Sequence, residues 1–380
     1  MATRSVRTST LSLVLAVLTV TACAGGAEPG RDEARRTGTH PVTRNTEPST
    51  PATVDATITP EPRPITIAFA GDVHFEGSLE ARLDDPQTAL SSIARELSKA
   101  DLTVVNLETS VGTSGNPEPK RFTFQAPPSA FDALAAAGVD VVTMANNHAG
   151  DFGRDGIRQA LDAADAVRSA NPPLAVVGIG HDADEAFAPA VVDIGGTTVT
   201  VLGASAADHD PTADPTGHLA ATDSQPGTAD AVDPTLLVRA VEQARTEADI
   251  VVVYLHWGIQ GQSCPSDAQT ELARATAEAG AGIVVGSHAH RLQGAGMLGD
   301  TFVAYGLGNF AWYTQASSAT TATGILTVTV DGGDVTGHEW TPAVIGSDGL
   351  PHPVDGSQAE RMTDEFAQLA DCTDLEPLSR

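Results

Sequence analysis

The sequence predicts an α/β domain, because short apolar runs rich in β-branched residues alternate with segments of helical periodicity. Several of these runs stop at polar residues of the kind that bind metals or move protons. Towards the C-terminus the helical segments end, and the remaining runs predict a second sheet that is mixed or antiparallel. The predicted strands of the alternating part are 65–70, 101–107, 139–144, 174–178, 250–255 and 282–286.

Helices are expected between these strands, each with apolar residues on one face. They are predicted at 88–100, 131–138, 156–169, 234–247 and 267–279.

Three other features complete the predicted layout. A Gly195-Gly196 turn predicts a hairpin between 190–194 and 197–202. Residues 209–230 are rich in Asp, Thr, Pro and Gly, which is typical of a long surface loop. The C-terminal part of the domain is expected to contain antiparallel strands without helices, at 299–307, 323–330 and 335–342.

The N-terminal residues 1–22 have the features of an export signal, with Arg4 and Arg7 before the apolar run 11–20. That run is shorter than the roughly 20 apolar residues of a transmembrane helix. The sequence ending at Cys23 resembles the bacterial lipobox, so Cys23 is expected to carry lipid and anchor the chain to the outer face of a membrane. An ordinary secretory signal with a chance Cys is the alternative. Residues 23–63 are poor in large apolar side chains and predict a disordered tether.

The chain is strongly acidic, with a formal net charge of -28 and an isoelectric point near 4.5. Phosphate backbones bind basic patches, so this charge argues against nucleic acid as a partner.

Two cysteines remain once Cys23 is assigned to lipid. An exported protein lies where disulfides persist, so Cys264 and Cys372 are expected to pair. The bond would tie a C-terminal tail (346–380) onto the main domain (64–345). Two buried free thiols are the alternative.

Ligand-type residues follow five of the predicted strands. In open α/β sheets, ligands bind beyond the carboxyl ends of the strands, so these residues are expected to converge on one site. The pairs Asp72-x-His74 and His288-x-His290 are expected to project to one side of an extended segment. If each residue merely capped its strand, no site would result. The residues are Asp72 and His74, Glu108, Asn147 and His148, His256, and finally His288 and His290.

The order of these motifs resembles that in the calcineurin-like metallophosphoesterases. Their amino-acid sequences resemble those of the CapA branch of capsule-synthesis proteins, also called polyglutamate capsule proteins. The resemblance covers about 65–309 and extends towards 342. It implies an αββα sandwich of two mixed sheets flanked by helices, with the metal site at the carboxyl ends of the strands. The matching segments are Gly71–His74, Asn106–Glu108, Asn146–Gly153, His256–Gly258, Gly286–Gln293 and Leu307–Phe310.

The resemblance also implies roles for the single residues. Asp72, His74 and His290 would bind one divalent ion, and Asn147, His256 and His288 the second. Glu108 stands where the phosphoesterases place a bridging Asp. It would either bridge the two ions or hold the metal ligands in place without binding an ion itself. His148 matches the general acid towards the leaving group, and Asp151 would orient it.

The chemistry of the residues agrees with these implied roles. Two ions about 4 Å apart lower the pKa of water and clamp the oxygens at phosphorus. Mixed nitrogen and oxygen ligands suit Mn, Fe or Zn. The sequence departs from the family at Gln260, where an acid is common, and at Gly306, where Ser is expected. Trp257 is equally suited to be a packed lid or a substrate platform.

These features together predict a lipid-anchored, extracytoplasmic protein of capsule or poly-γ-glutamate biosynthesis with a phosphoesterase-type hydrolase site. Its expected partners are an envelope or capsule polymer, or a phosphoester, and subunits of a capsule synthase. A non-catalytic accessory subunit that binds polymer is one alternative. A metal-dependent amidase acting on the same polymer is the other, because activated water attacks either electrophile.

Overall fold

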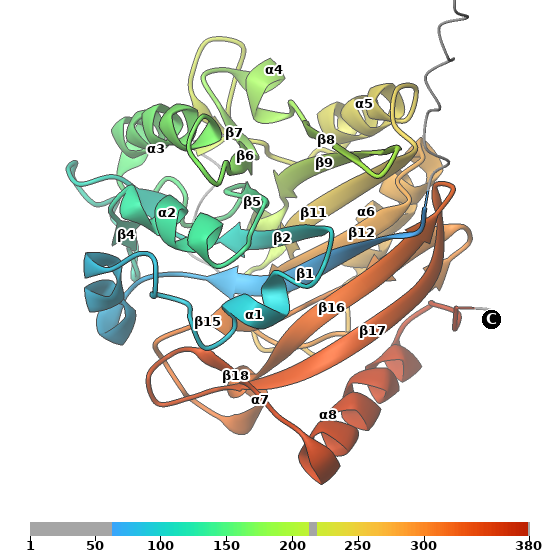
Figure 1. Ribbon diagram of the computed structural model, residues 1–380. Helices are drawn as coiled ribbons and strands as arrows, with labels where there is room; N and C mark the ends of the chain where they lie inside the picture. Colours follow the sequence, from blue (N-terminus) through green and yellow to red (C-terminus); the bar gives the residue numbers. More distant parts are fainter. Residues whose placement is uncertain (1–62, 213–218, 379–380) are drawn as a thin grey trace, which may run out of the picture. The chain divides into compact units, whose positions relative to one another are not determined.

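The computed structural model describes residues 63–212 and 219–378. Within them, two β-sheets pack face to face with helices on their outer surfaces (Figure 1). Three N-terminal predictions lie outside the described residues: the export signal (1–22), lipidation at Cys23 and nearly all of the tether (23–63). No helix within the described ranges is long and apolar enough to cross a membrane.

The first sheet is built around β1, which lies between a parallel half and an antiparallel half. Its order is β18-β17-β16-β1-β2-β5-β6, and β15 adds a short parallel pairing at the carboxyl end of β1. The strands are β1 (Ile65–Val73), β2 (Leu102–Leu107), β5 (Val141–Thr143), β6 (Ala175–Val177), β15 (Asn309–Ala311), β16 (Ala322–Asp331), β17 (Asp334–Ile345) and β18 (Pro351–Pro353).

The second sheet has the order β13-β14-β12-β11-β9-β8, with parallel strands in its centre and an antiparallel strand at each edge. Two short pairs, β3 with β4 and β7 with β10, lie in the connections. The bounds are β13 (Ala295–Leu298), β14 (Thr301–Ala304), β12 (Ile283–His288), β11 (Ile250–Trp257), β9 (Thr197–Ser205), β8 (Ala190–Ile194), β3 (Ser110–Val111), β4 (Gln125–Ala126), β7 (Ile179–Gly180) and β10 (Gly227–Thr228).

Alternation along the strands divides the core into layers. On β1, Ile65, Ile67 and Phe69 face the second sheet, while Ala68 and Ala70 face the outer helices. The outer layer of the first sheet includes η1 (Gly77–Asp84), α1 (Ala94–Leu97), α2 (Ser129–Ala136) and α3 (Gly153–Arg168); that of the second includes α4 (Ala183–Ala186), α5 (Thr235–Ala244) and α6 (Asp267–Ala279). The predicted αββα sandwich of two mixed sheets is therefore confirmed.

Three local predictions differ from the structure. The helix predicted at 88–100 is α-helical only over α1, because 88–93 forms successive tight turns that still bury Leu90 and Ile93. The strand predicted at 299–307 is shorter, and it pairs parallel to β12; a turn at Gly299, with φ of +62°, joins it to β13. The predicted loop 209–230 is partly buried and contains β10.

Helices also occur within and after the C-terminal region that was predicted to contain only strands. The short α7 (Ser318–Thr321) precedes β16, and the C-terminal tail forms α8 (Gly356–Gln368) and η4 (Leu369–Cys372). Figure 1 shows α8 lying along β17, and Phe366 on α8 stacks on Trp340 of β17 with ring centroids 4.3 Å apart. Both rings belong to the core between the sheets. The tail thus packs against β17 of the first sheet and adds to the core between the sheets.

Candidate metal centre

The carboxyl ends of β1, β2, β5, β11 and β12 bring the predicted site residues together. Asp72 lies near the end of β1, Glu108 directly follows β2, and Asn147 and His148 follow β5. His256 lies near the end of β11 and His288 at the end of β12. The register aligns Asp72 with Asn106 on β2, and His256 with Ser287 on β12. The hydrogen bond from His288 N to Asp72 Oδ2 joins the strand ends of the two sheets into one edge. Gly71 lets the backbone of Gly308 approach, because a Cβ there would lie 1.9 Å from the Gly308 carbonyl oxygen.

The ligand atoms form two groups that share Glu108. Asp72, Glu108 and His290 make the first, and Glu108, His256 and His288 the second; within each group the ligand atoms lie within 4.8 Å of one another. The Asn147 Oδ1 atom, 2.7 Å from His256 Nε2, adds an oxygen to the second group. Except for His74, which belongs to neither group, the residues are grouped as the resemblance implied, and Glu108 is common to both groups.

Glu108 is fully buried, and neither of its carboxylate oxygens has a hydrogen-bond partner within the part of the chain that the structure describes. Burial, and next the charge of Asp72, raise the pKa of this carboxyl well above its ordinary value. A buried acceptor without a partner costs free energy, which a cation would offset. The donor set therefore fits a pair of divalent ions, and its mixture of imidazoles and carboxylates is the one that suits Mn, Fe or Zn.

Asp210 is a site residue that the sequence prediction missed. Its Oδ2 atom lies 3.3 Å from Nε2 of His288, whose other ring nitrogen faces His256 Nε2 at 3.1 Å. Burial alone would raise the pKa of Asp210, but hydrogen bonds from His288, Gln260 N and Thr212 outweigh it and lower that pKa. An ionised Asp210 can accept Nε2–H and leave Nδ1 of His288 as a ligand, as carboxylates behind metal-binding histidines do.

A signal for Asp210 was present in the sequence. β9 runs to Ser205, and it is parallel to β11, so Asp210 lies five residues beyond a sixth strand end at the same edge. The predicted strand stopped at 202, which left Asp210 in the supposed surface loop.

Two asparagines connect the strand ends. Asn106 donates to Asp72 Oδ1 at 2.7 Å, and His288 N donates to the other oxygen at 3.1 Å. Burial would raise the pKa of Asp72, but the charges of His256 and His290, and then hydrogen bonds from Ser287 and Asn106, outweigh burial and lower that pKa. Asn146, to which no role was assigned, donates to Asn106 Oδ1 and to the Leu107 carbonyl. It fixes the loop after β5 against the end of β2.

His148 and Asp151 form the predicted pair. His148 Nδ1 lies 2.6 Å from Asp151 Oδ2, and its Nε2 lies 3.8 Å from Glu108 Oε1. The ring stacks on Phe124 with centroids 4.2 Å apart. Burial lowers the pKa of His148 to about 4, against the raising effect of Asp151. The Asp151 carboxylate accepts Nδ1–H of His148 and directs its Nε2 towards Glu108 and the two groups of ligand atoms.

His74 is buried beside the site without joining either group of converging atoms. Its ring stacks on Trp312 with centroids 3.8 Å apart, and its Nε2 accepts a hydrogen bond from Tyr313 N at 3.1 Å. His74 Nδ1, which has no partner within the described ranges, is the atom left for a ligand role. The stacking contact explains why the Asp-x-His spacing alone did not determine the ring's direction.

The segment from His288 to His290 was predicted to be extended, and this prediction is wrong. His288 has φ of +95° and His290 φ of +51°, a region that side chains other than glycine rarely adopt. Such backbone strain is held by surrounding contacts and clusters at functional sites. His290 Nδ1 lies 2.8 Å from Asn309 Oδ1 and 3.6 Å from Asp72 Oδ2, so the turn brings it to the first group.

A cleft of about 300 Å³ opens onto the site. Its wall includes His148, His290 and Gln260, together with an aromatic rim of Phe122, Phe124, Trp312 and Tyr313. Trp257 does not line it: this side chain is 1% exposed and donates from Nε1 to the Tyr305 carbonyl. Of the two roles considered for Trp257, packing is the one that its contacts favour.

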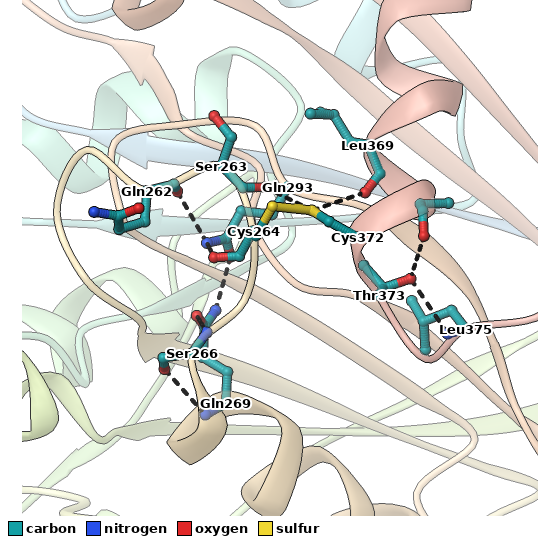
Figure 2. The surroundings of a disulfide bond; sticks show 11 residues. Gln262, Ser263, Cys264, Ser266, Gln269, Gln293, Leu369, Cys372, Thr373 and Leu375 are labelled. Carbon is teal, nitrogen blue, oxygen red and sulfur yellow. Dashed lines mark hydrogen bonds between the residues drawn. A yellow bond between two sulfur atoms is a disulfide. The ribbon is translucent and has the colours of Figure 1, made fainter.

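A disulfide joins Cys264 to Cys372, with their Cα atoms 5.7 Å apart (Figure 2). Figure 2 shows Gln293 beside it, donating from its side-chain amide to the carbonyls of Gln262 and Cys264. The bond fastens the loop after β11, which carries Gln260, to the C-terminal tail.

The fold and the site define a two-sheet αββα protein with a buried carboxylate–imidazole centre at its strand ends. Residues 66–314 match the family described as bacterial capsule synthesis protein PGA_cap, and since this match spans more than half of the chain, the chain belongs to that family.

Curated relatives carry related names. The chain is 34% identical over 223 residues to the PGA biosynthesis protein CapA of Bacillus subtilis, covering 55% of this chain and 54% of that protein. It is 32% identical over 184 residues to the capsule biosynthesis protein CapA of Bacillus anthracis, covering 47% and 42%. The chain thus spans about half the length of the curated relatives it matches. Among solved structures, a novel phosphatase from Mycoplasma pneumoniae is similar over 74% of this chain and 94% of that one, with 15% identity and a TM-score of 0.47.

Proposed function

We propose that the protein is a metal-dependent hydrolase of phosphoester type that acts in the biosynthesis of capsule or poly-γ-glutamate. The observation that carries the proposal is Glu108, a fully buried carboxylate that belongs to both groups of ligand atoms and whose two oxygens accept no hydrogen bond from any described residue. A group so placed is costly without a cation and useful with one. The role in capsule synthesis draws support from the family and from the names of the Bacillus relatives.

Each part of the site has a task in such a reaction. Asp72 and His290 would hold one ion with Glu108, while His256, His288 and Asn147 would hold the second. Two divalent ions supply Lewis-acid stabilisation at phosphorus and make water nucleophilic near neutral pH. His148 Nε2, aimed into the centre, would carry a proton to or from the reacting oxygen, and Asp151 would keep the ring oriented. The aromatic rim would bind the organic part of the substrate.

Metal analysis and a substrate panel test this proposal. The purified protein should contain about two transition-metal ions per chain, as a shared carboxylate between two sites implies. With Mn²⁺ it should hydrolyse an aryl phosphate or phosphodiester, and Asp72→Ala and His290→Ala should abolish that turnover. His181→Ala is the matched control, because this histidine is exposed and pairs with Glu185. The proposal would be refuted if the purified protein held no transition metal and cells carrying Asp72→Ala and His290→Ala kept the wild-type phenotype.

The same panel separates the alternatives. Release of glutamate oligomers from poly-γ-glutamate, with phosphoesters left intact, would identify an amidase. Metal binding and polymer binding without turnover would identify an accessory protein.

We also propose an extracytoplasmic, lipid-anchored location, with a capsule polymer and synthase subunits as partners. The support is the sequence up to Cys23, with its apolar run followed by small residues. Cells given an alkyne-labelled fatty acid should label the wild-type chain and not Cys23→Ala, which should leave the membrane fraction. Equal labelling of both would contradict the proposed anchor.

A further inference from the structure

One of the two lysines in the chain is buried behind the candidate metal centre. The sequence contains nineteen arginines and only Lys99 and Lys120. The Lys99 side chain is 61% exposed and pairs with Glu96 on the surface, whereas that of Lys120 is 2% exposed. Burying an ammonium group is expensive unless it is paired and hydrogen-bonded, so the contacts of Lys120 indicate what its charge does.

Lys120 contacts both functional parts of the loop after β5. Its Nζ atom lies 2.5 Å from Asp151 Oδ1 and 2.5 Å from the Asn147 carbonyl oxygen. The other carboxylate oxygen of Asp151 accepts a hydrogen bond from Phe124 N at 2.7 Å and lies 2.6 Å from His148 Nδ1. The segment 118–124 therefore holds the Asp151 carboxylate from two sides, and Lys120 links it to Asn147.

We propose that Lys120 is a positioning residue for His148. Its ammonium group pairs with the buried Asp151 carboxylate and fixes it in place, so that Asp151 accepts Nδ1–H of His148 and directs Nε2 to the reacting oxygen. Lys120 does not reach the cleft, and it acts only through Asp151 and the Asn147 carbonyl. This inference rests on the proposed function, because it concerns a proton that His148 transfers at the metal centre.

The leaving group of the substrate provides the test, in the metal-loaded full-length protein. Protonation of the departing oxygen matters for phenyl phosphate and hardly matters for 2,4-dinitrophenyl phosphate, whose leaving group is stable as an anion. Lys120→Met should lower kcat for phenyl phosphate about 100-fold, the range of lost acid–base catalysis, and lower it less than about threefold for the dinitrophenyl ester. KM and bound metal should not change. Lys99→Met is the matched control and should behave as wild type.

A double-mutant cycle tests whether Lys120 acts through Asp151. If it does, Lys120→Met combined with Asp151→Asn should cost no more than Asp151→Asn alone, because the second change removes the charge that Lys120 compensates. Equal losses on both esters, or additive losses in the cycle, would overturn the inference. Should Lys120→Met not fold, Lys120→Arg, which keeps the charge and displaces the donor, takes its place with the same expected leaving-group dependence.

A second measurement does not depend on turnover. In Zn²⁺-loaded protein with ¹⁵N-labelled histidine, the His148 signal, assigned by its loss in His148→Gln, should show protonation at Nδ1. Lys120→Met should convert it to a mixture of tautomers, while Lys99→Met leaves it unchanged. An unaltered His148 signal in Lys120→Met would refute the positioning role. If wild type hydrolyses neither ester, the proposed function fails, and this signal still decides the role of Lys120.

Discussion

The strand ends and the loops around the site contribute different groups. Asp72, His256 and His288 lie on strands whose register is fixed by pairing on both sides, and each side chain is fully buried. Lys120 and Asp210 come from irregular segments, and neither belongs to the two groups of converging ligand atoms. They contact the residues that do the chemistry or hold the ions. The strands thus provide candidate ligands at fixed positions, and the loops orient them.

The largest effect should follow a change at a strand end. Glu108→Gln removes the carboxylate shared by both groups, so we expect at least about a 100-fold loss of metal affinity, beyond what loss of an orienting partner costs. Isothermal titration with Zn²⁺ measures this, together with the number of ions bound. If Glu108→Gln still bound two ions with unchanged affinity, Glu108 would not be a metal ligand. The proposed difference between ligands at strand ends and orienting residues in loops would then be wrong.

A change in a loop should cost less. Asp210→Asn removes the acceptor behind His288, and we expect metal affinity to fall about 10- to 100-fold, as is typical for the partner of a metal-binding histidine. The control is Asp223→Asn, an exposed position in the same connection. The same titration applies, and a loss as large as that of Glu108→Gln would place Asp210 among the ligands themselves.

The distinction also explains what the sequence could predict. Strand ends were found because a buried strand has a clear apolar pattern and the residue after it has a predictable place. The convergence of Asp72, Glu108, His256 and His288 follows from that rule, whereas the αββα layers were implied by the resemblance to the metallophosphoesterases. Lys120 was missed because it lies in 112–124, a segment of irregular backbone between the short strands β3 and β4.

Ring directions and local helix lengths were equally beyond the sequence. The direction of His74 depends on a stack with Trp312, which is remote in sequence. The positive φ angles of His288 and His290 result from tertiary contacts that outweigh an extended conformation. The turns at 88–93 likewise bury the apolar face of the predicted helix without forming one.

Removing the disulfide tests how much metal binding depends on the covalent link between the loop after β11 and the C-terminal tail. Cys264→Ser with Cys372→Ser should lower the free energy of unfolding by about 2–4 kcal/mol, typical for a lost disulfide. Metal affinity should change less than about threefold, because the strand ends that hold the ligands stay paired. Urea unfolding and metal titration measure the two quantities. Comparing masses of alkylated protein before and after reduction shows whether the bond forms, and two thiols that alkylate without reduction would contradict it.

The two ends of β2 give the smallest and most local contrast. Asp101 precedes β2 at its amino end, where it accepts hydrogen bonds from Thr66 N at 2.9 Å and pairs with Arg63. The side-chain hydrogen bond from Arg63 is the largest cause that lowers the pKa of Asp101, to about 2. A lowered carboxyl pKa stabilises the folded state above the unfolded value near 4, and this contribution is lost as the pH falls towards 2. Glu108, at the other end of the strand, has a raised pKa, so in the metal-free protein its contribution has the opposite sign and stability falls as the pH rises.

Asp101→Asn should therefore reduce the free energy of unfolding at pH 7 by about 0.5–1 kcal/mol, since Asp101 is partly exposed and solvent screens its ion pair. The difference from wild type should shrink between pH 4 and pH 2, the window set by the unfolded pKa near 4 and the folded value of about 2. Metal affinity should not change, because Asp101 lies at the edge of the sheet opposite the site. Urea unfolding across this pH range measures the first effect and titration with Zn²⁺ the second. A loss of metal affinity in Asp101→Asn would mean that the amino ends of the strands also hold the site in place, and that the contrast between the two edges is weaker than the contacts indicate.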